Sequence, residues 1–310
     1  MRLSAHMKLV LAVAMGALGV ASTAAHADSH SWAAIKGTVS PKLTIAVSVD
    51  FVPMRKLATF NTMVSKLIAS NGEVAKGLDL MKSSCQLDVT SVVTDISVIV
   101  DENKKGAVAI GFDGTDRGAI EACLAKLANT NKDGKTITHK EVGGVTEYTA
   151  TGETDKLRLK WIGKNAVILS TEPTDAKALK TALVKTNAKS PLSKLIAKTN
   201  TASPAWFAIA ISKDIEQGIK MTGASGQVDI TTDKLTVAAR MSLSTADAAT
   251  KVVAEATAAM PQLAKQVAKA PDLAKVVASA KIAADGSDVT ATASAAVASL
   301  PALIQQIMSM

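Results

Sequence analysis

Few residues of this 310-residue chain have side chains that bind metals or act as nucleophiles. It has four histidines and two cysteines, Cys85 and Cys123, whose spacing matches neither C-x-x-C nor a zinc-ligand pattern. His30 lies in a polar lead-in, and His139 is the only histidine in a region expected to fold. A multi-histidine metal site or a histidine-based triad lacks the residues it needs, so we expect no metal and no cofactor.

The most suggestive motif is Gly111-Phe112-Asp113-Gly114-Thr115, where a strand is expected to meet a helix. It resembles the D-x-D-G-T signature of haloacid-dehalogenase-type phosphatases, in which the first aspartate is the nucleophile. Gly111 stands at that position and has no side chain to attack with. We therefore predict that Asp113-Gly114 forms a turn and that Thr115 caps the helix.

Two further near matches lie in the loop that follows this helix. Gly134-Lys135-Thr136 ends like a P-loop, but Asn129 stands where that motif opens with glycine. Asn129, Asn131 and Asp133 imitate the first half of a calcium loop, but Lys140 occupies the twelfth position, where an acidic ligand is needed. A polar turn is the expected structure, with weak calcium binding as the alternative.

Other enzyme motifs are missing from the sequence. Ser225 lies in a short Gly-rich stretch, 223–226, which we expect to be a turn without a base. A carboxylate pair for glycoside hydrolysis stays open, although three Trp and one Tyr are few rings for lining a sugar site. We expect a non-catalytic protein, with a carboxylate-based hydrolase as an alternative.

Residues 1–27 have the form of a secretory signal peptide, with a basic start and an apolar run over 9–21. Ala25 and Ala27 satisfy the A-x-A cleavage pattern, so the mature chain should begin at Asp28. The apolar run is shorter than the roughly 20 residues that span a bilayer. We expect a periplasmic or extracellular protein without stable membrane insertion after cleavage, and an uncleaved anchor is the alternative.

Export favours a disulfide between the two cysteines, because thiols outside the cytoplasm are usually oxidised. We predict a Cys85–Cys123 disulfide that contributes roughly 3–4 kcal/mol through loop closure. Two separately buried thiols are the alternative.

The composition limits the partners and the core. The chain is 48% hydrophobic and only 3% aromatic, so its core must consist of aliphatic side chains. Its formal net charge of +8 comes from scattered lysines, without the interleaved aromatics of nucleic-acid surfaces. We expect no nucleic-acid partner; the envelope partner, whether protein, lipid or polymer, is unknown.

Hydrophobic periodicity predicts strands, helices and hairpins in two similar halves. The elements expected in the first half are a strand over 45–51, helical segments over 57–68 and 74–84, a hairpin of 92–100 and 108–112, a helix over 116–129, three short strands and a helix after Thr174. The elements expected in the second half are a strand over 207–211, a hairpin of 228–230 and 235–243, a capped helix from Ser244, a strand over 289–295 and a final helix over 300–307. We infer an internal duplication.

A shorter repeat, 261–268 and 271–278, predicts two amphipathic helices that each begin with proline. Core packing explains their thin apolar stripe better than a membrane surface does. The uncharged stretch 289–310 is long enough to cross a bilayer, but it is rich in Ala, Ser and Thr, which favours a strand and a helix over a tail anchor.

The layout resembles that of uncharacterised secreted proteins of Gram-negative bacteria with a duplicated α+β body. Cys85, the Ala122-Cys123-Leu124 triplet and the hairpin between them carry this resemblance. It implies a fold and an extracytoplasmic location, but no function.

Together these patterns predict an α+β protein of two similar units, each an antiparallel sheet with helices packed on one face. The expected division is a signal peptide (1–27), a flexible lead-in (28–42), a first unit (43–187), a linker or helix (188–204) and a second unit (205–310). We expect a binding or scaffolding role in the cell envelope; the alternative is a carrier that encloses a lipid or other apolar ligand between sheet and helices.

Overall fold

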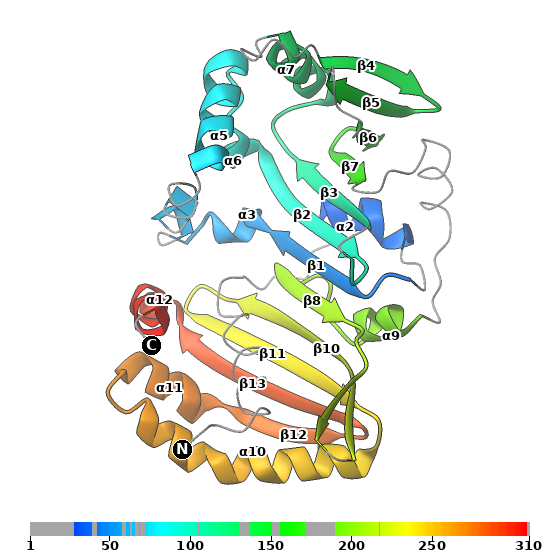
Figure 1. The fold of residues 1–310 in the computed structure, drawn as a ribbon. Coiled ribbons are helices and arrows are strands. Elements are labelled where there is room, and N and C mark those ends of the chain that lie inside the picture. The colour runs from blue at the N-terminus through cyan, green and yellow to red at the C-terminus, as the bar shows by residue number, and fades with distance from the viewer. Residues whose placement is uncertain are drawn as a thin grey trace. The chain divides into compact units, whose positions relative to one another are not determined.

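The structure is a computed structural model that describes residues 28–38, 42–57, 60–62, 64–65, 68, 72–103, 106–129, 137–150, 156–170, 190–216 and 218–308. They form two compact units, Ala27–Ser190 and Pro191–Met310, each an α+β fold on an antiparallel sheet (Figure 1). The α+β class is confirmed. The predicted signal peptide, the loop 131–136 and the helix expected after Thr174 lie outside the described residues.

The sheet of the N-terminal unit has the strand order β1-β2-β3-β7-β6-β5-β4. Its strands are β1 (Ile45–Asp50), β2 (Val93–Val100), β3 (Gly106–Phe112), β4 (Ile137–Val142), β5 (Val145–Ala150), β6 (Lys156–Ile162) and β7 (Ala166–Ser170). Its helices are α2 (His30–Ile35), α3 (Phe51–Met54), α5 (Gly72–Cys85), α6 (Val89–Val92) and α7 (Arg117–Asn129), with a 3-10 turn, η1 (Lys36–Thr38).

One face of this sheet packs against α7. Ile120 of α7 lies in a buried cluster with Phe112, Leu159 and Val167 of the strands. The predicted disulfide is confirmed, and it joins the end of α5 to the middle of α7. Burial of the apolar stripe on α7 therefore decides where α5 lies.

The opposite face is covered by α2, so residues 30–35 of the predicted flexible lead-in (28–42) form a packed helix instead. Ser29 caps the helix, because its Oγ accepts the Trp32 backbone N–H at 3.3 Å. Trp32 and Ile35 are 3% and 0% exposed, and α2 contacts β2, β3 and β7. Helices therefore lie on both faces of this sheet, which corrects the expected one-sided packing.

The sheet of the C-terminal unit has the strand order β12-β13-β11-β10-β8, and β9 also pairs with β10. Its strands are β8 (Ala205–Ile209), β9 (Lys213–Glu216), β10 (Ile219–Ile230), β11 (Lys234–Leu243), β12 (Lys281–Asp285) and β13 (Asp288–Ala296). Its helices are α9 (Pro191–Ala197), α10 (Ala246–Gln266), α11 (Pro271–Ser279) and α12 (Leu300–Met308), with a 3-10 turn, η2 (Val297–Ser299).

Helices cover both faces of this sheet as well. α10 and α11 contact β12 and β13 on one face. On the other face α9 approaches β10 so closely that a Cβ at Gly223 would lie 2.5 Å from a Leu195 methyl. Leu192 and Leu195 are buried, so α9 belongs to this unit rather than to a free linker.

Several local predictions need correction. Four strands, not three, follow α7, because Gly143 and Gly163 adopt positive φ and close two tight hairpins. Asp116 rather than Thr115 caps α7, since its Oδ1 accepts the Ala119 N–H at 2.8 Å. Thr245 rather than Ser244 caps α10, where its Oγ1 accepts the Ala248 N–H at 3.2 Å.

The predicted repeat over 261–278 is largely helical, but only its second copy begins a helix at proline. Pro271 begins α11, but Pro261 lies inside α10 instead of starting a helix. Leu263 and Leu273 are buried in one cluster, which favours core packing over a membrane surface. None of the described helices has the length and apolarity that crossing a bilayer requires.

The two sheets share part of their topology. The order β1-β2-β3-β7-β6 in the N-terminal unit matches the order β8-β10-β11-β13-β12 in the C-terminal unit. In each, a capped helix follows the hairpin, and a later hairpin returns beside its second strand. The N-terminal unit adds β4 and β5, and the C-terminal unit adds β9. This shared order supports the proposal of an internal duplication.

Candidate functional site

The face of the C-terminal sheet that carries α10 and α11 has small side chains at its centre. Strand pairing places Gly226 of β10 beside Ala239 of β11, and Ala239 beside Ala291 of β13. Phe207 of β8 pairs with Gly226 at the end of this row. Hydrogen and methyl side chains leave space above the sheet that larger side chains would fill.

Two separate hydrophobic clusters lie on this face. In the first, Met221, Met241 and Val289 of the strands pack against Ala249 and Val252 of α10. The second contains buried side chains of α10, α11, α12 and the end of β13: Leu263, Leu273, Val276, Val277, Ala295 and Leu303. In Figure 1, α10 and α11 lie along the β12–β13 side of the sheet. The row of small residues therefore lies outside both clusters.

An apolar cavity of about 110 Å³ lies over this row. Its lining includes Phe207, Ile209, Met221, Ala239, Met241 and Ala291. This volume corresponds to about four water molecules at roughly 30 Å³ each, or to about four methylene groups of similar size. Since drug-sized ligands occupy roughly 300–1,000 Å³, the cavity as it stands has room for the end of a hydrocarbon chain rather than for a whole lipid.

Gly226 positions the aromatic side of the cavity. A Cβ on this residue would lie 2.7 Å from the Phe207 ring. Only a glycine lets the ring approach the backbone of β10 so closely, and any larger residue would push it away from the sheet. Phe207 is half-buried, so its ring forms part of the cavity's accessible wall.

Arg240 contributes to the lining from β11, but its charged group binds elsewhere. Its Nη1 donates to Asp288 Oδ2 at 2.6 Å and to Asp285 Oδ2 at 2.9 Å. Because neighbouring residues of a strand point to opposite faces, these contacts lie on the face away from Ala239 and Met241. Among the described residues that line the cavity, Arg240 alone has an ionisable side chain, and its guanidinium lies on the other face.

Asp288 is the centre of this polar cluster on the opposite face. Its side chain is 4% exposed and accepts hydrogen bonds from Lys198 Nζ at 2.7 Å and Ser242 Oγ at 2.7 Å as well as from Arg240. Burial alone would raise the pKa of Asp288, but these three donors outweigh burial and hold the pKa below its ordinary value. The cluster ties Lys198, the residue that follows α9, to β11 and β13.

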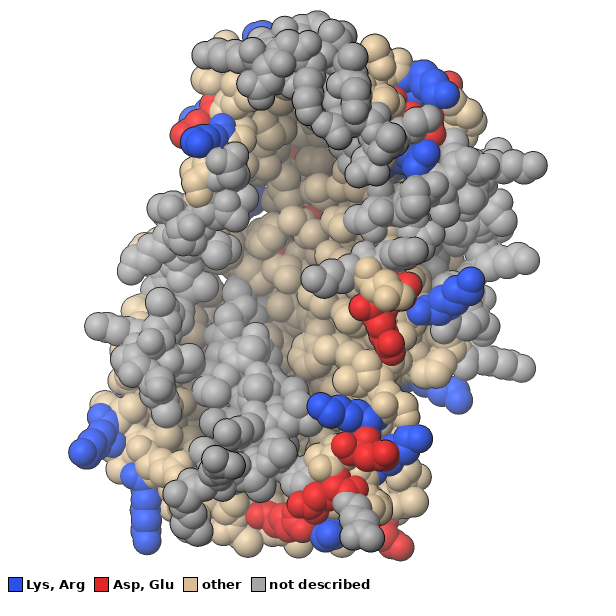
Figure 2. Space-filling view, in the orientation of Figure 1, with Lys and Arg blue, Asp and Glu red and all other residues tan. Residues whose placement is uncertain are grey.

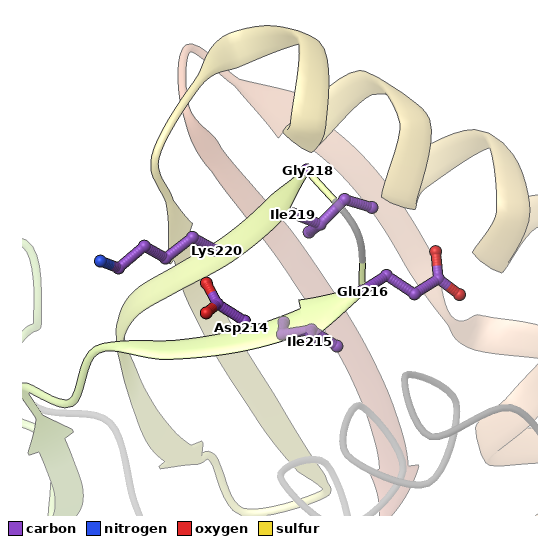
Figure 3. Close-up of a pocket in the computed structure, with 6 residues that line it drawn as sticks. All are labelled: Asp214, Ile215, Glu216, Gly218, Ile219 and Lys220. Carbon is purple, nitrogen blue, oxygen red and sulfur yellow. The ribbon is translucent and has the colours of Figure 1, made fainter.

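A second hollow of about 470 Å³ lies at the β9–β10 hairpin (Figure 3). Asp214 and Glu216 line it, and both are exposed. In Figure 3 their carboxylates extend in different directions, and Glu216 Oε2 lies 3.7 Å from Lys251 Nζ. These two carboxylates do not form the converging pair that glycoside hydrolysis needs.

The N-terminal unit buries a polar cluster beneath α2. Asp95, 2% exposed, accepts the Ser31 backbone N–H at 2.5 Å and the Thr94 hydroxyl at 2.7 Å. The hydroxyls of Ser31 and Ser48 each lie 2.8 Å from that of Ser97. Every polar group named here has a hydrogen-bond partner within the cluster. The role of this polar cluster is therefore to hold α2 on the sheet.

The remaining candidate site residues from the sequence do not lie together in the structure. His30 is half exposed and lies 3.9 Å from Asp95, and the ring of His139 on β4 lies 5.7 Å from the ring of Tyr148 on β5. Ser225 is buried in the middle of β10, so the predicted Gly-rich turn was wrong. Asp113 Oδ1 accepts the Gly114 N–H at 2.8 Å in the expected turn.

Among the described residues, no group of three or more His, Cys, Asp or Glu side chains could hold a metal ion. On the face shown in Figure 2, the described Lys and Arg side chains lie singly or beside Asp and Glu rather than in one basic patch. Ala25 and Ala27 lie outside the described residues, and Asp28 accepts a hydrogen bond from Lys36 Nζ at 2.6 Å.

The comparisons with known proteins assign no family to the chain. No family model matches it, and no curated protein does. Solved structures of TP0453 align over much of its length at low identity. Crystal form III shares 11% identity at a TM-score of 0.47, covering 86% of this chain and 96% of that chain. Crystal form IV shares 12% identity at a TM-score of 0.47, covering 89% and 99%.

Proposed function

We propose that this chain is a non-catalytic binding protein of the cell envelope that holds the hydrocarbon end of an apolar ligand in the C-terminal cavity. The observation that carries the proposal is the cavity itself, which is lined by Ala239 and Ala291 of the row of small residues and by Phe207 beside Gly226. Cavities of about 150 Å³ with purely apolar walls stay dry and bind small hydrocarbons. The lining of this cavity is mostly apolar as well, and one side of the cavity is accessible.

The size of the cavity limits its share of the affinity. Burying about four methylene groups contributes about 3 kcal/mol, less than the roughly 4 kcal/mol that a millimolar dissociation constant requires. The remaining affinity must therefore come from the part of the ligand that extends beyond the cavity, past the half-buried lining residues Phe207, Ile209 and Ile211. A polar head group would stay in water.

Two observations support an envelope location and a non-catalytic role. The Cys85–Cys123 disulfide is the kind of bond that forms in an oxidising compartment, in keeping with the signal-peptide pattern of 1–27. Arg240, the charged residue among the described residues that line the cavity, is paired with Asp285 and Asp288 on the other face.

Titration of the mature protein with N-phenyl-1-naphthylamine, a neutral apolar fluorophore, tests this function. Ala239→Leu and Ala291→Leu fill the row and should weaken binding at least tenfold while keeping or raising the thermal midpoint. Ala283→Leu adds the same side chain at an exposed position of β12 and serves as the matched control. Equal binding by Ala239→Leu and Ala283→Leu would overturn the proposal.

The alternative of a filled core and an outer surface that binds a protein or polymer makes a different prediction. A solvent extract of the protein purified from its own envelope should then contain no lipid by mass spectrometry, and the fluorophore should not bind. Stoichiometric lipid in the extract, lost from Ala239→Leu, supports the cavity.

A further inference from the structure

The cavity has one accessible side and one closed side. Its lining from the row Phe207, Ala239 and Ala291 is half-buried, whereas the lining from the next row is almost fully buried. Strand pairing forms this second row from Ile209, Ala224, Met241 and Val289, of which all but Ile209 are buried. A ligand therefore enters over the small residues and meets Met241 at the closed side.

Two methionines dominate this closed side. Met221 and Met241 are 3% and 8% exposed and pack in the same cluster as Ala248 and Ala249 of α10. Methionine is unbranched and has three rotatable side-chain bonds, so it changes conformation at low cost and adapts to irregular gaps. On the α10 side of this cluster, Ala248 and Ala249 contribute only methyl groups.

The rest of the lining is stiff by comparison. Ile209, Ile211 and Val289 are β-branched, and their χ1 angles are restricted. Phe207 lies against Gly226, and Ala239 and Ala291 have no side-chain torsion that could open space. The cavity can lengthen only where Met221 and Met241 form its end.

We infer that Met221 and Met241 are an adjustable end wall that sets the ligand class, which is a straight hydrocarbon chain, and its preferred length. This inference rests on the proposed function. A straight chain can push the two thioether side chains back along one direction, whereas a fused ring or a branched chain needs width that the stiff side walls do not allow. Affinity should therefore increase with chain length beyond the four carbons that the cavity holds at rest.

The test is displacement of N-phenyl-1-naphthylamine by straight-chain fatty acids of six to sixteen carbons. The wild-type protein should bind the ten-carbon acid at least tenfold more tightly than the six-carbon acid. Met241→Ile replaces the flexible wall with a β-branched residue of similar size and should reduce that ratio at least threefold. Met241→Ala removes the wall and should increase the ratio by a similar factor.

Met260→Ile is the matched control, because Met260 packs against the second cluster, away from the cavity lining. Its chain-length profile should equal that of the wild type. If the Met241 variants give the wild-type profile while Ala239→Leu still weakens binding at least tenfold, the adjustable wall is wrong and the proposed function stands. If no fatty acid displaces the fluorophore and Ala239→Leu binds it normally, the proposed function fails as well.

Discussion

Asp288 is the residue whose charge matters most to the C-terminal unit, because it is buried and three donors converge on it. Asp288→Asn removes the charge but keeps the shape. We expect it to cost about 2 kcal/mol of unfolding free energy at pH 7. This is less than the roughly 3–5 kcal/mol for breaking a fully buried pair, because the Lys198 and Arg240 side chains are 45% and 24% exposed. Urea unfolding measures this difference.

The same variant has a defined pH dependence. The pKa of Asp288 lies lower in the folded protein than its ordinary value of 3.8. Its stabilising contribution is therefore complete above that value and is lost as the pH falls through the folded-state pKa. The difference between wild type and Asp288→Asn should shrink below a pH of about 4. A difference that is constant between pH 7 and pH 2.5, or Asp285→Asn matching the effect despite its 67% exposure, would contradict this account.

Gly111 gives a prediction in the N-terminal unit. A Cβ there would lie 2.1 Å from Asp95 Oδ2, so Gly111→Ala should cost about 2–3 kcal/mol through overpacking. Gly77→Ala, in α5 with nothing within 4 Å, should be neutral or stabilising. Thermal unfolding compares the two. The Gly111→Ala/Asp95→Ala double variant should lose less stability than the sum of the single variants; additive losses would show that the two sites do not interact.

The sequence shows that Gly111 cannot act as a nucleophile, but it does not predict that Asp95 packs against Gly111. The missing nucleophile is visible in the motif itself. The close approach of Gly111 to Asp95 depends on the pairing of β2 with β3 and on a bulge between Val93 and Asp95. Neither feature can be predicted from a local sequence pattern.

At the scale of elements, the disulfide is the strongest constraint between α5 and α7. Replacing Cys85 and Cys123 by alanine should lower the unfolding free energy by about 4 kcal/mol, as expected for a separation of 38 residues. Unfolding with and without a reductant measures this loss. The alanine variant should not respond to the reductant, and a wild-type protein that is equally indifferent would contradict the role of the bond.

The elements that the sequence predicted best are those with long periodic patterns. The helix over 116–129 and the hairpin of 92–100 and 108–112 have enough residues for their period to be visible, and they agree with α7 and β2–β3. The second predicted hairpin agrees with β11 but included only the last three residues of β10. α2 has six residues, fewer than two turns, so its polar surroundings suggested a lead-in. The cavity could not be predicted, because Gly226, Ala239 and Ala291 come together only through strand register.

At the scale of the whole molecule, the predicted cleavage site before Asp28 lies two residues before the start of α2. Cleavage before Asp28 leaves Ser29, which caps α2, and the buried Trp32 and Ile35 intact. We expect the intact mass of the exported protein to correspond to a chain that begins at Asp28. A mass that retains residues 1–27, or a chain that begins beyond Ser29, would contradict this reading.

The central claim is that the C-terminal unit encloses a hydrocarbon over the row of small residues. Methyl NMR of the mature protein, labelled at Ala, Ile and Met and titrated with decanoic acid, observes that event directly. We expect chemical-shift changes and ligand contacts at Ala239, Ala291, Ile209 and Met241, with Ala283 unchanged. Decanoic acid that leaves these four methyl signals unmoved, or moves only exposed ones such as that of Ala283, would contradict the claim.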